Sequence, residues 1–120
     1  MSQRDPLTIL AVDDDALVLM STAAMLEELG HRVLEAVSGS DALRLLQDGG
    51  VDLVITDQAM PGMTGVELAQ AVNKHWPSLP IVVATGYSDL PPGSPQYPMI
   101  AKPFGEKDLA NVISQVFAAG

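Results

Sequence analysis

Short apolar runs rich in Val, Ile and Leu recur along this chain, separated by longer and more polar segments. Runs of this length and composition are typical of buried strands in a parallel sheet, and they are too short for a confident helix assignment. We expect strands at residues 7–12, 31–36, 53–55 with Asp57 at the strand end, 80–84 and 99–101. The second of these strands is the most polar, and we expect it to be the more exposed one.

The segments between the runs repeat apolar residues every three or four positions, which is the period of one helix face. We expect helices at residues 16–29, 65–75 and 106–117, and another that begins after Ser38 or Ser40 and ends near Gly49. Strands that alternate with helices predict an α/β fold of repeated βα units. The sheet would be parallel, with helices on both faces, in a single domain spanning residues 1–120.

The helix at residues 16–29 has more apolar positions than one buried face needs. Asp15 is a good N-cap for it, and Gly30 suits the turn that ends it. The expected buried stripe, at i, i+4, i+7 and i+11, comprises Val18, Thr22, Met25 and Leu29. Off this stripe lie Leu17, Met20 and Ala24. They either border the neighbouring helix or form a docking surface for another protein.

Composition and charge narrow the range of functions. The 120 residues suit one hydrophobic core, and the net charge of −9 with a pI near 4.3 argues against a nucleic-acid binder, which needs a basic face. An acidic chain is compatible with binding a cation or a basic partner surface. The absence of cysteine excludes disulfides and Cys-ligated zinc.

The sequence also bears on location and assembly. No apolar run approaches the roughly 18 residues of a membrane span, and the first residues lack a signal-peptide pattern. We expect a soluble cytoplasmic protein that binds neither a membrane nor a nucleic acid, as a monomer or weak dimer.

Polar groups follow four of the predicted strands. Asp13 and Asp14 come after the first strand, Asp57 after the third, Thr85 after the fourth and Lys102 after the fifth. The carboxyl ends of parallel strands share one edge of the sheet, where ligands bind in open α/β folds. Crowded carboxylates require a cation, and all-oxygen ligands suit Mg²⁺. A carboxylate nucleophile with Mg²⁺, a lysine and a hydroxyl describes a site for phosphoryl transfer onto a side chain.

Each of these residues alone has a simpler explanation. The acids after the first strand fit a solvated turn and helix cap, and Asp57 fits a turn residue. Thr85 would then be a strand-end hydroxyl, and Lys102 one of several surface cations. The arrival of all of them at one sheet edge favours a functional site.

Four segments that contain these groups resemble the receiver domain of two-component response regulators, over essentially the whole chain. They are residues 9–15 (ILAVDDD), 52–65 (DLVITDQAMPGMTG), 82–86 (VVATG) and 101–104 (AKPF). Each segment alone is moderately specific, and together they are highly specific. The resemblance implies a flavodoxin-like three-layer fold with strand order 2-1-3-4-5.

The same resemblance implies a signalling phosphoacceptor, with its own autophosphorylation and autodephosphorylation chemistry, and not an enzyme. Asp57 would accept the phosphoryl group from a histidine kinase or a histidine phosphotransfer protein. Thr85 and Lys102 would contact the phosphoryl oxygens. The domain would then relay the signal by conformational change or onward transfer to a downstream protein.

Magnesium is the cofactor that the resemblance implies. Asp14, Asp57 and the backbone carbonyl of Ala59 would ligate Mg²⁺ directly, and Asp13 would act through water. These assignments come from the family and not from the spacing of the residues.

The chain departs from the family pattern in two places. The family's switch positions fall on Thr85 and Met99, and the second is usually Tyr or Phe. The segment between Thr85 and Lys102 is short and contains Pro91, Pro92, Gly93 and Pro95. We therefore expect the fourth helix of the family to be short or missing here.

Two other functions fit parts of the sequence. A haloacid-dehalogenase-type, Mg²⁺-dependent phosphatase would use Asp13 as its nucleophile, because Asp13 and Asp15 supply an Asp-x-Asp pair. The chain lacks room for the cap of such an enzyme and lacks a late acidic pair for the metal. A degenerate receiver that only binds other proteins is disfavoured, because all the site residues are present.

Overall fold

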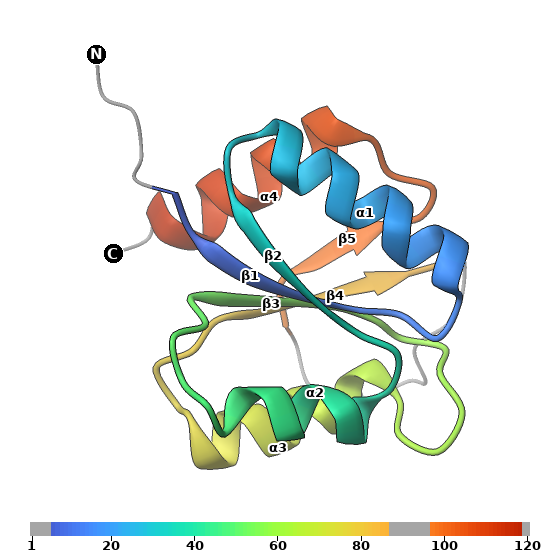
Figure 1. Ribbon diagram of the computed structural model, residues 1–120, viewed down its shortest axis with the longest axis vertical. Coiled ribbons are helices and arrows are strands. Elements are labelled where there is room, and N and C mark those ends of the chain that lie inside the picture. Colours follow the sequence, from blue (N-terminus) through green and yellow to red (C-terminus); the bar gives the residue numbers. More distant parts are fainter. Residues whose placement is uncertain (1–5, 87–96, 119–120) are drawn as a thin grey trace.

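The computed structural model describes residues 6–86 and 97–118. Within these residues the chain forms one parallel sheet flanked by helices (Figure 1). The strands are β1 (Thr8–Val12), β2 (Arg32–Ala36), β3 (Leu53–Asp57), β4 (Ile81–Thr85) and β5 (Met99–Ala101). The helices are α1 (Ala16–Glu28), α2 (Gly39–Leu46), α3 (Gly65–His75) and α4 (Glu106–Ala118).

The strands lie in the order β2-β1-β3-β4-β5, and every neighbouring pair is parallel. This confirms the predicted flavodoxin-like topology. In Figure 1, α1 and α4 cover one face of the sheet while α2 and α3 cover the other. The predicted shortening or loss of a helix between β4 and β5 falls on residues 87–96, outside the described residues. The extent of the domain, residues 1–120, stays a prediction.

The sheet contributes to two hydrophobic cores, because successive side chains of a strand point to opposite faces. Fully buried on the α1 and α4 side are Ile9, Leu26, Leu53, Val82 and Leu109. Fully buried on the α2 and α3 side are Leu10, Val54, Leu68, Val72 and Val83. Within the described residues, no helix has the length and apolar character needed to cross a membrane.

β3 is the central strand of the sheet, and all five of its residues are buried. Helices cover both faces of the sheet here, so the strand is a continuous hydrophobic run with no polar alternation until Thr56 and Asp57. β2 lies at one edge of the sheet and three of its five residues are exposed, which confirms the prediction of a more exposed strand.

The helix ends follow the predicted capping residues. Asp15 is the N-cap of α1, and its Oδ1 accepts hydrogen bonds from the Leu17 and Val18 amides at 2.9 and 3.2 Å. Gly30 follows α1 with a φ of +96°, a conformation that favours glycine. Ser38, and not Ser40, is the N-cap of α2.

The inward face of α1 differs from the predicted stripe. Buried along α1 are Leu19, Thr22, Ala23 and Leu26. Three members of the predicted stripe, Val18, Met25 and Leu29, are only half-buried. The helix is apolar on nearly every side, so two stripes that differ by a small rotation both fit its sequence. Packing against the sheet and α4 selected one of them.

A glycine allows α3 to begin directly against β3. A Cβ atom built at Gly65 would overlap the Asp57 carbonyl oxygen and lie 2.9 Å from the Gln58 Cα. Both of these are backbone atoms, which cannot rotate away as the end of a side chain can. The close approach of α3 to the end of β3 therefore requires glycine at this position.

We expect Gly65→Ala to lower the free energy of unfolding by about 2 kcal/mol, the usual cost of forcing an extra methyl group into a packed site. Urea denaturation measures this change. Gly105→Ala is the matched control, because its Cβ would meet nothing closer than 3.9 Å. Equal stability of the two variants would contradict the steric argument.

Candidate functional site

The predicted polar groups lie at the carboxyl edge of the sheet. Strand pairing aligns Val12 with Thr56, and Asp57 with Ala84. Asp13 directly follows β1, and Asp57 is the last residue of β3. Pairing of β1 with β3 thus brings acids that are 44 positions apart in the sequence to neighbouring strand ends.

Three carboxylates cluster at this edge. Asp13, Asp14 and Asp57 each offer an oxygen, and these oxygens lie within 4.8 Å of one another. Asp13 and Asp57 are 6% and 5% exposed, whereas Asp14 is exposed. The structure therefore brings together the three acidic residues that the sequence analysis selected. Two of them are removed from solvent, and the third faces it.

Lys102 is the cation of this cluster. Its Nζ donates to the Asp57 Oδ1 at 2.5 Å and lies 3.6 Å from the Asp13 Oδ2. Its backbone amide donates to the Thr85 carbonyl at 2.8 Å, which ties the end of β5 to the end of β4. Lys102 thus pairs with two of the three clustered carboxylates, so the described part of the site has an excess of negative charge.

The pKa values of two groups reflect this crowding. Burial raises the pKa of Asp13 above its usual value of 3.8, and the charges of Asp57 and Asp14 add to the rise. The Asp15 amide, which donates to the Asp13 Oδ1 at 2.9 Å, and Lys102 oppose it. For Lys102, burial alone would lower the pKa, but the hydrogen bond and charge of Asp57 outweigh it and raise the pKa above 10.5. Lys102 is therefore charged at neutral pH, and ionised Asp13 is held at an energetic cost.

The other predicted site residues lie at different distances from this cluster. Ala59 is exposed in the loop after β3, two positions beyond Asp57. Thr85 is half-buried at the end of β4, one residue past the partner of Asp57 in the strand pairing. Met99 lies at the start of β5 and is 49% exposed. Met99 therefore lies at the amino end of the strand that leads to Lys102, and it is not buried.

Gln58 is a site neighbour that the sequence analysis did not select. It directly follows Asp57, and it is 5% exposed. Its side-chain Oε1 accepts a hydrogen bond from the Val66 amide of α3 at 2.8 Å. A polar residue immediately after the buried run of β3 was the available signal, but its partner could be known only from the fold.

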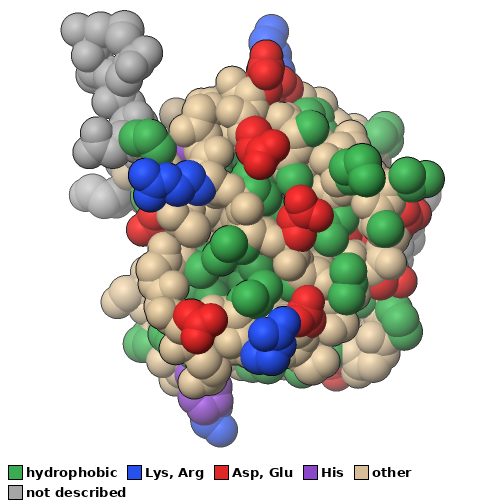
Figure 2. Space-filling view, viewed as in Figure 1, with side chains coloured by type: hydrophobic (Ala, Val, Ile, Leu, Met, Phe, Trp, Pro, Cys, Tyr) green, Lys and Arg blue, Asp and Glu red, His purple; other side chains and the backbone are tan. Residues whose placement is uncertain are grey.

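An apolar hollow of about 510 Å³ lies beside the cluster, between α1 and the segment after β5. Leu17, Met25 and Phe104 contribute to its lining, and Lys102 reaches it from the site. Leu17 and Met20 of α1 are 76% and 62% exposed. Figure 2 shows hydrophobic side chains gathered on the side of the molecule where α1 begins.

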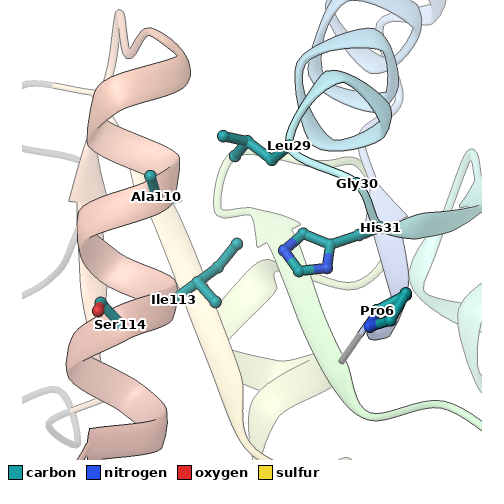
Figure 3. A pocket seen from close by; sticks show the side chains of 7 residues that line it. All are labelled: Pro6, Leu29, Gly30, His31, Ala110, Ile113 and Ser114. Carbon is teal, nitrogen blue, oxygen red and sulfur yellow. The ribbon is translucent and has the colours of Figure 1, made fainter. Parts of the chain in front are cut away.

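A second hollow, of about 400 Å³, lies at the opposite end of the sheet, between the end of α1 and α4 (Figure 3). The His31 ring points into it, and the Nδ1 of that ring accepts a hydrogen bond from the Leu7 amide at 3.1 Å. None of the predicted site residues lines this hollow. The acidic cluster and this hollow are therefore separate features at opposite ends of the strands.

Comparisons with known proteins agree with the geometry. The family model described as the response regulator receiver domain matches residues 9–114. The sensor kinase CckA of Brucella abortus is 31% identical over 116 residues, which cover 91% of this chain and 12% of the kinase. The sensor histidine kinase GacS of Pseudomonas protegens is 34% identical over 125 residues, which cover 94% of this chain and 13% of that protein. The chain thus spans about an eighth of the length of these two relatives.

A solved structure gives the same result. A response regulator receiver domain protein from Clostridium thermocellum matches with a TM-score of 0.86 at 28% identity, over 94% of this chain and 95% of that one. None of these comparisons supports the alternative of a dehalogenase-type phosphatase with Asp13 as its nucleophile. The matched residues include every member of the predicted site. The chain belongs to the response regulator receiver domain family, the phosphoacceptor signalling domains of two-component systems.

Proposed function

We propose that Asp57 is the phosphoacceptor and that its phosphoryl donor is a histidine kinase or a histidine phosphotransfer protein. The observation that carries this proposal is the position of Asp57 among two further carboxylates and Lys102, whose Nζ contacts its Oδ1 at 2.5 Å. A nucleophilic carboxylate needs nearby positive charge to receive an anionic phosphoryl group, and this site has one lysine and the ligands for a cation.

The donor set fits magnesium. Oxygens from Asp13, Asp14 and Asp57 lie within 4.8 Å of one another, and Mg²⁺ prefers carboxylate oxygen, water and phosphate ligands. The backbone carbonyl of the exposed loop residue Ala59 would be a third direct ligand beside Asp14 and Asp57, and Asp13 would act through water. When bound, Mg²⁺ supplies positive charge that offsets the repulsion among the carboxylates and the incoming phosphoryl group.

Asp57, Lys102 and Thr85 would have different roles in the proposed phosphoryl transfer. A carboxylate oxygen of Asp57 forms the new O–P bond while the P–N bond of the donor phosphohistidine breaks, and the departing imidazole takes a proton from water. Lys102 pairs with the phosphoryl oxygens once the transfer is complete, and Thr85 donates its hydroxyl to them. Autophosphorylation from a small-molecule phosphodonor would follow the same path, with the P–O bond of the donor breaking.

The hollow beside α1 suits the surface of the kinase or phosphotransfer protein. Leu17 and Met20 are large apolar residues that are mostly exposed, and exposed apolar patches commonly mark protein interfaces. Lys102 connects this hollow to the acidic cluster. A helical donor that packed against α1 would therefore bring its phosphohistidine close to Asp57.

Acetyl phosphate labelling tests the phosphoacceptor directly. We expect Mg²⁺-dependent incorporation of one phosphoryl group into the wild type and none into Asp57→Asn, because the amide is no nucleophile. Mass spectrometry of the intact protein measures the incorporation. Asp48→Asn, which changes an exposed acid after α2, should label as the wild type does. Labelling of Asp57→Asn at the wild-type level would disprove the assignment.

Asp13→Asn should stabilise the metal-free protein. The change removes a buried charge that Asp57 and Asp14 repel. Two unit charges at this separation repel by on the order of 1 kcal/mol in water and by more at a buried site. Because folding raises the pKa of Asp13, its ionisation lowers stability by an amount that is fully present above the folded-state pKa and falls away between that pKa and the unfolded value. The gain should therefore be present at neutral pH and shrink as the pH falls toward 3.8, the usual value. Urea denaturation across this pH range, without Mg²⁺, measures it; a less stable variant at neutral pH would contradict the repulsion.

Met20→Glu should slow phosphotransfer from a histidine kinase by about 10-fold or more, the effect of losing one well-packed interface side chain. Labelling by acetyl phosphate should be unchanged, because small molecules do not need the α1 surface. Leu34→Glu, at an exposed position of the edge strand β2, is the control. An equal loss with both phosphodonors would show that Met20 acts on the site itself and would reject the docking surface.

A further inference from the structure

Gln58 connects the end of β3 to three separate parts of the fold. Its backbone amide donates to the Ala84 carbonyl of β4 at 3.0 Å. Its backbone carbonyl accepts from the Met60 and Gly65 amides, each at 3.0 Å. Its buried side chain accepts from the Val66 amide at 2.8 Å. These four hydrogen bonds hold in place the residue that follows Asp57.

These contacts make Gln58 a cap for α3. The first amides of a helix have no partner inside the helix, and those of Gly65 and Val66 both bind Gln58, one through its backbone and the other through its side chain. The next amide, that of Glu67, is bound instead by the Thr64 Oγ1 at 3.2 Å. The first amides of α3 are therefore bound by two residues: Gln58, which is adjacent to Asp57, and Thr64, which lies seven positions beyond Asp57.

The contacts of Gln58 also constrain the loop between β3 and α3. Ala59 lies between two residues that are held in place. Gln58 is hydrogen-bonded to β4 and to α3. Met60 is 5% exposed, and its amide donates to the Gln58 carbonyl. If the side chain of Gln58 lost its acceptor oxygen, the buried Val66 amide would have no hydrogen-bond partner. The start of α3 would then shift to bring this amide to another acceptor. Gly65 packs so closely against the Asp57 carbonyl that a Cβ atom at this position would overlap it. A shift of α3 would therefore displace the end of β3 and the loop that follows it.

We propose that Gln58 is a positioning residue of the phosphoacceptor site: its side chain, bound to the Val66 amide, holds the Ala59 carbonyl and Asp57 where a magnesium ion would bind both. The inference rests on the proposed function, because it assumes that Mg²⁺ binds at this cluster. It adds a residue that contacts neither the ion nor the phosphoryl group. Mutation of a residue that orients a metal ligand from outside typically lowers metal affinity by about 10- to 100-fold.

Two variants separate positioning from simple helix capping. Gln58→Met keeps the length of the side chain and removes the acceptor for Val66. Thr64→Val removes the neighbouring cap of the same helix, for Glu67, without touching the residue after Asp57. We expect the dissociation constant for Mg²⁺, measured by calorimetry on the full chain, to rise about 10-fold in Gln58→Met and to stay at the wild-type value in Thr64→Val. Equal constants in the two variants would overturn the inference.

Gln58→Glu is the conservative rescue. Its carboxylate accepts from the Val66 amide as the amide oxygen does, so Mg²⁺ should bind at least as tightly as in the wild type. Weakened binding in Gln58→Glu, equal to that in Gln58→Met, would overturn the inference, because the acceptor would then be irrelevant.

Hydrogen exchange on the wild type provides a test that needs no variant to fold. If a fixed Gln58 favours Mg²⁺ binding, then Mg²⁺ must favour the fixed state by the same factor. Saturating Mg²⁺ should therefore slow exchange of the Val66 amide and leave that of Glu67 unchanged. An unchanged Val66 amide overturns the inference while leaving the proposed function intact. Failure of the wild type to bind Mg²⁺ at all overturns the proposed function, and the inference with it.

Discussion

Electrostatic repulsion among three carboxylates at one sheet edge is the constraint around which this domain is built. Asp13, Asp14 and Asp57 present oxygens within 4.8 Å of one another, opposed by Lys102 alone among the described cations near them. Such a cluster is unfavourable for folding: burial first, and then the charges of Asp57 and Asp14, raise the pKa of Asp13. The two hydrophobic cores compensate for it, because they hold the strand ends in place regardless of the charges.

The same cores explain why the acids meet. β1 and β3 are buried on both faces and pair in a single register, with Val12 opposite Thr56. A slip by one residue would turn each strand's inward side chains to the other core, so the register is strongly specified. Asp13 directly follows β1 and Asp57 is the last residue of β3, so these two acids have no freedom to separate. Precise placement of the site therefore comes from hydrophobic packing, and the polar contacts refine it.

Under the proposed function, different surroundings of the cluster would serve the chemistry and the recognition of the donor. On one side lies a loop fixed by Gln58 and by the tight contact at Gly65, where backbone positions matter. On the other side lies the hollow next to α1, where Leu17 and Met20 present exposed apolar area. Lys102 borders both. A donor protein at α1 and an ion at the acidic cluster would thus approach Asp57 from different directions.

The strand order was implied by the resemblance of the sequence motifs to receiver domains. The sequence by itself determined the alternation of strands with helices, the helix caps at Asp15 and Gly30 and the membership of the acidic cluster. These features depend on local periodicity and on the rule that parallel strands end at one edge. Only the tertiary structure decided which face of α1 is buried, since that helix is apolar on nearly every side and its rotation depends on what packs against it. It also decided the partner of Gln58, because a hydrogen bond across eight residues depends on where α3 docks and not on any local pattern.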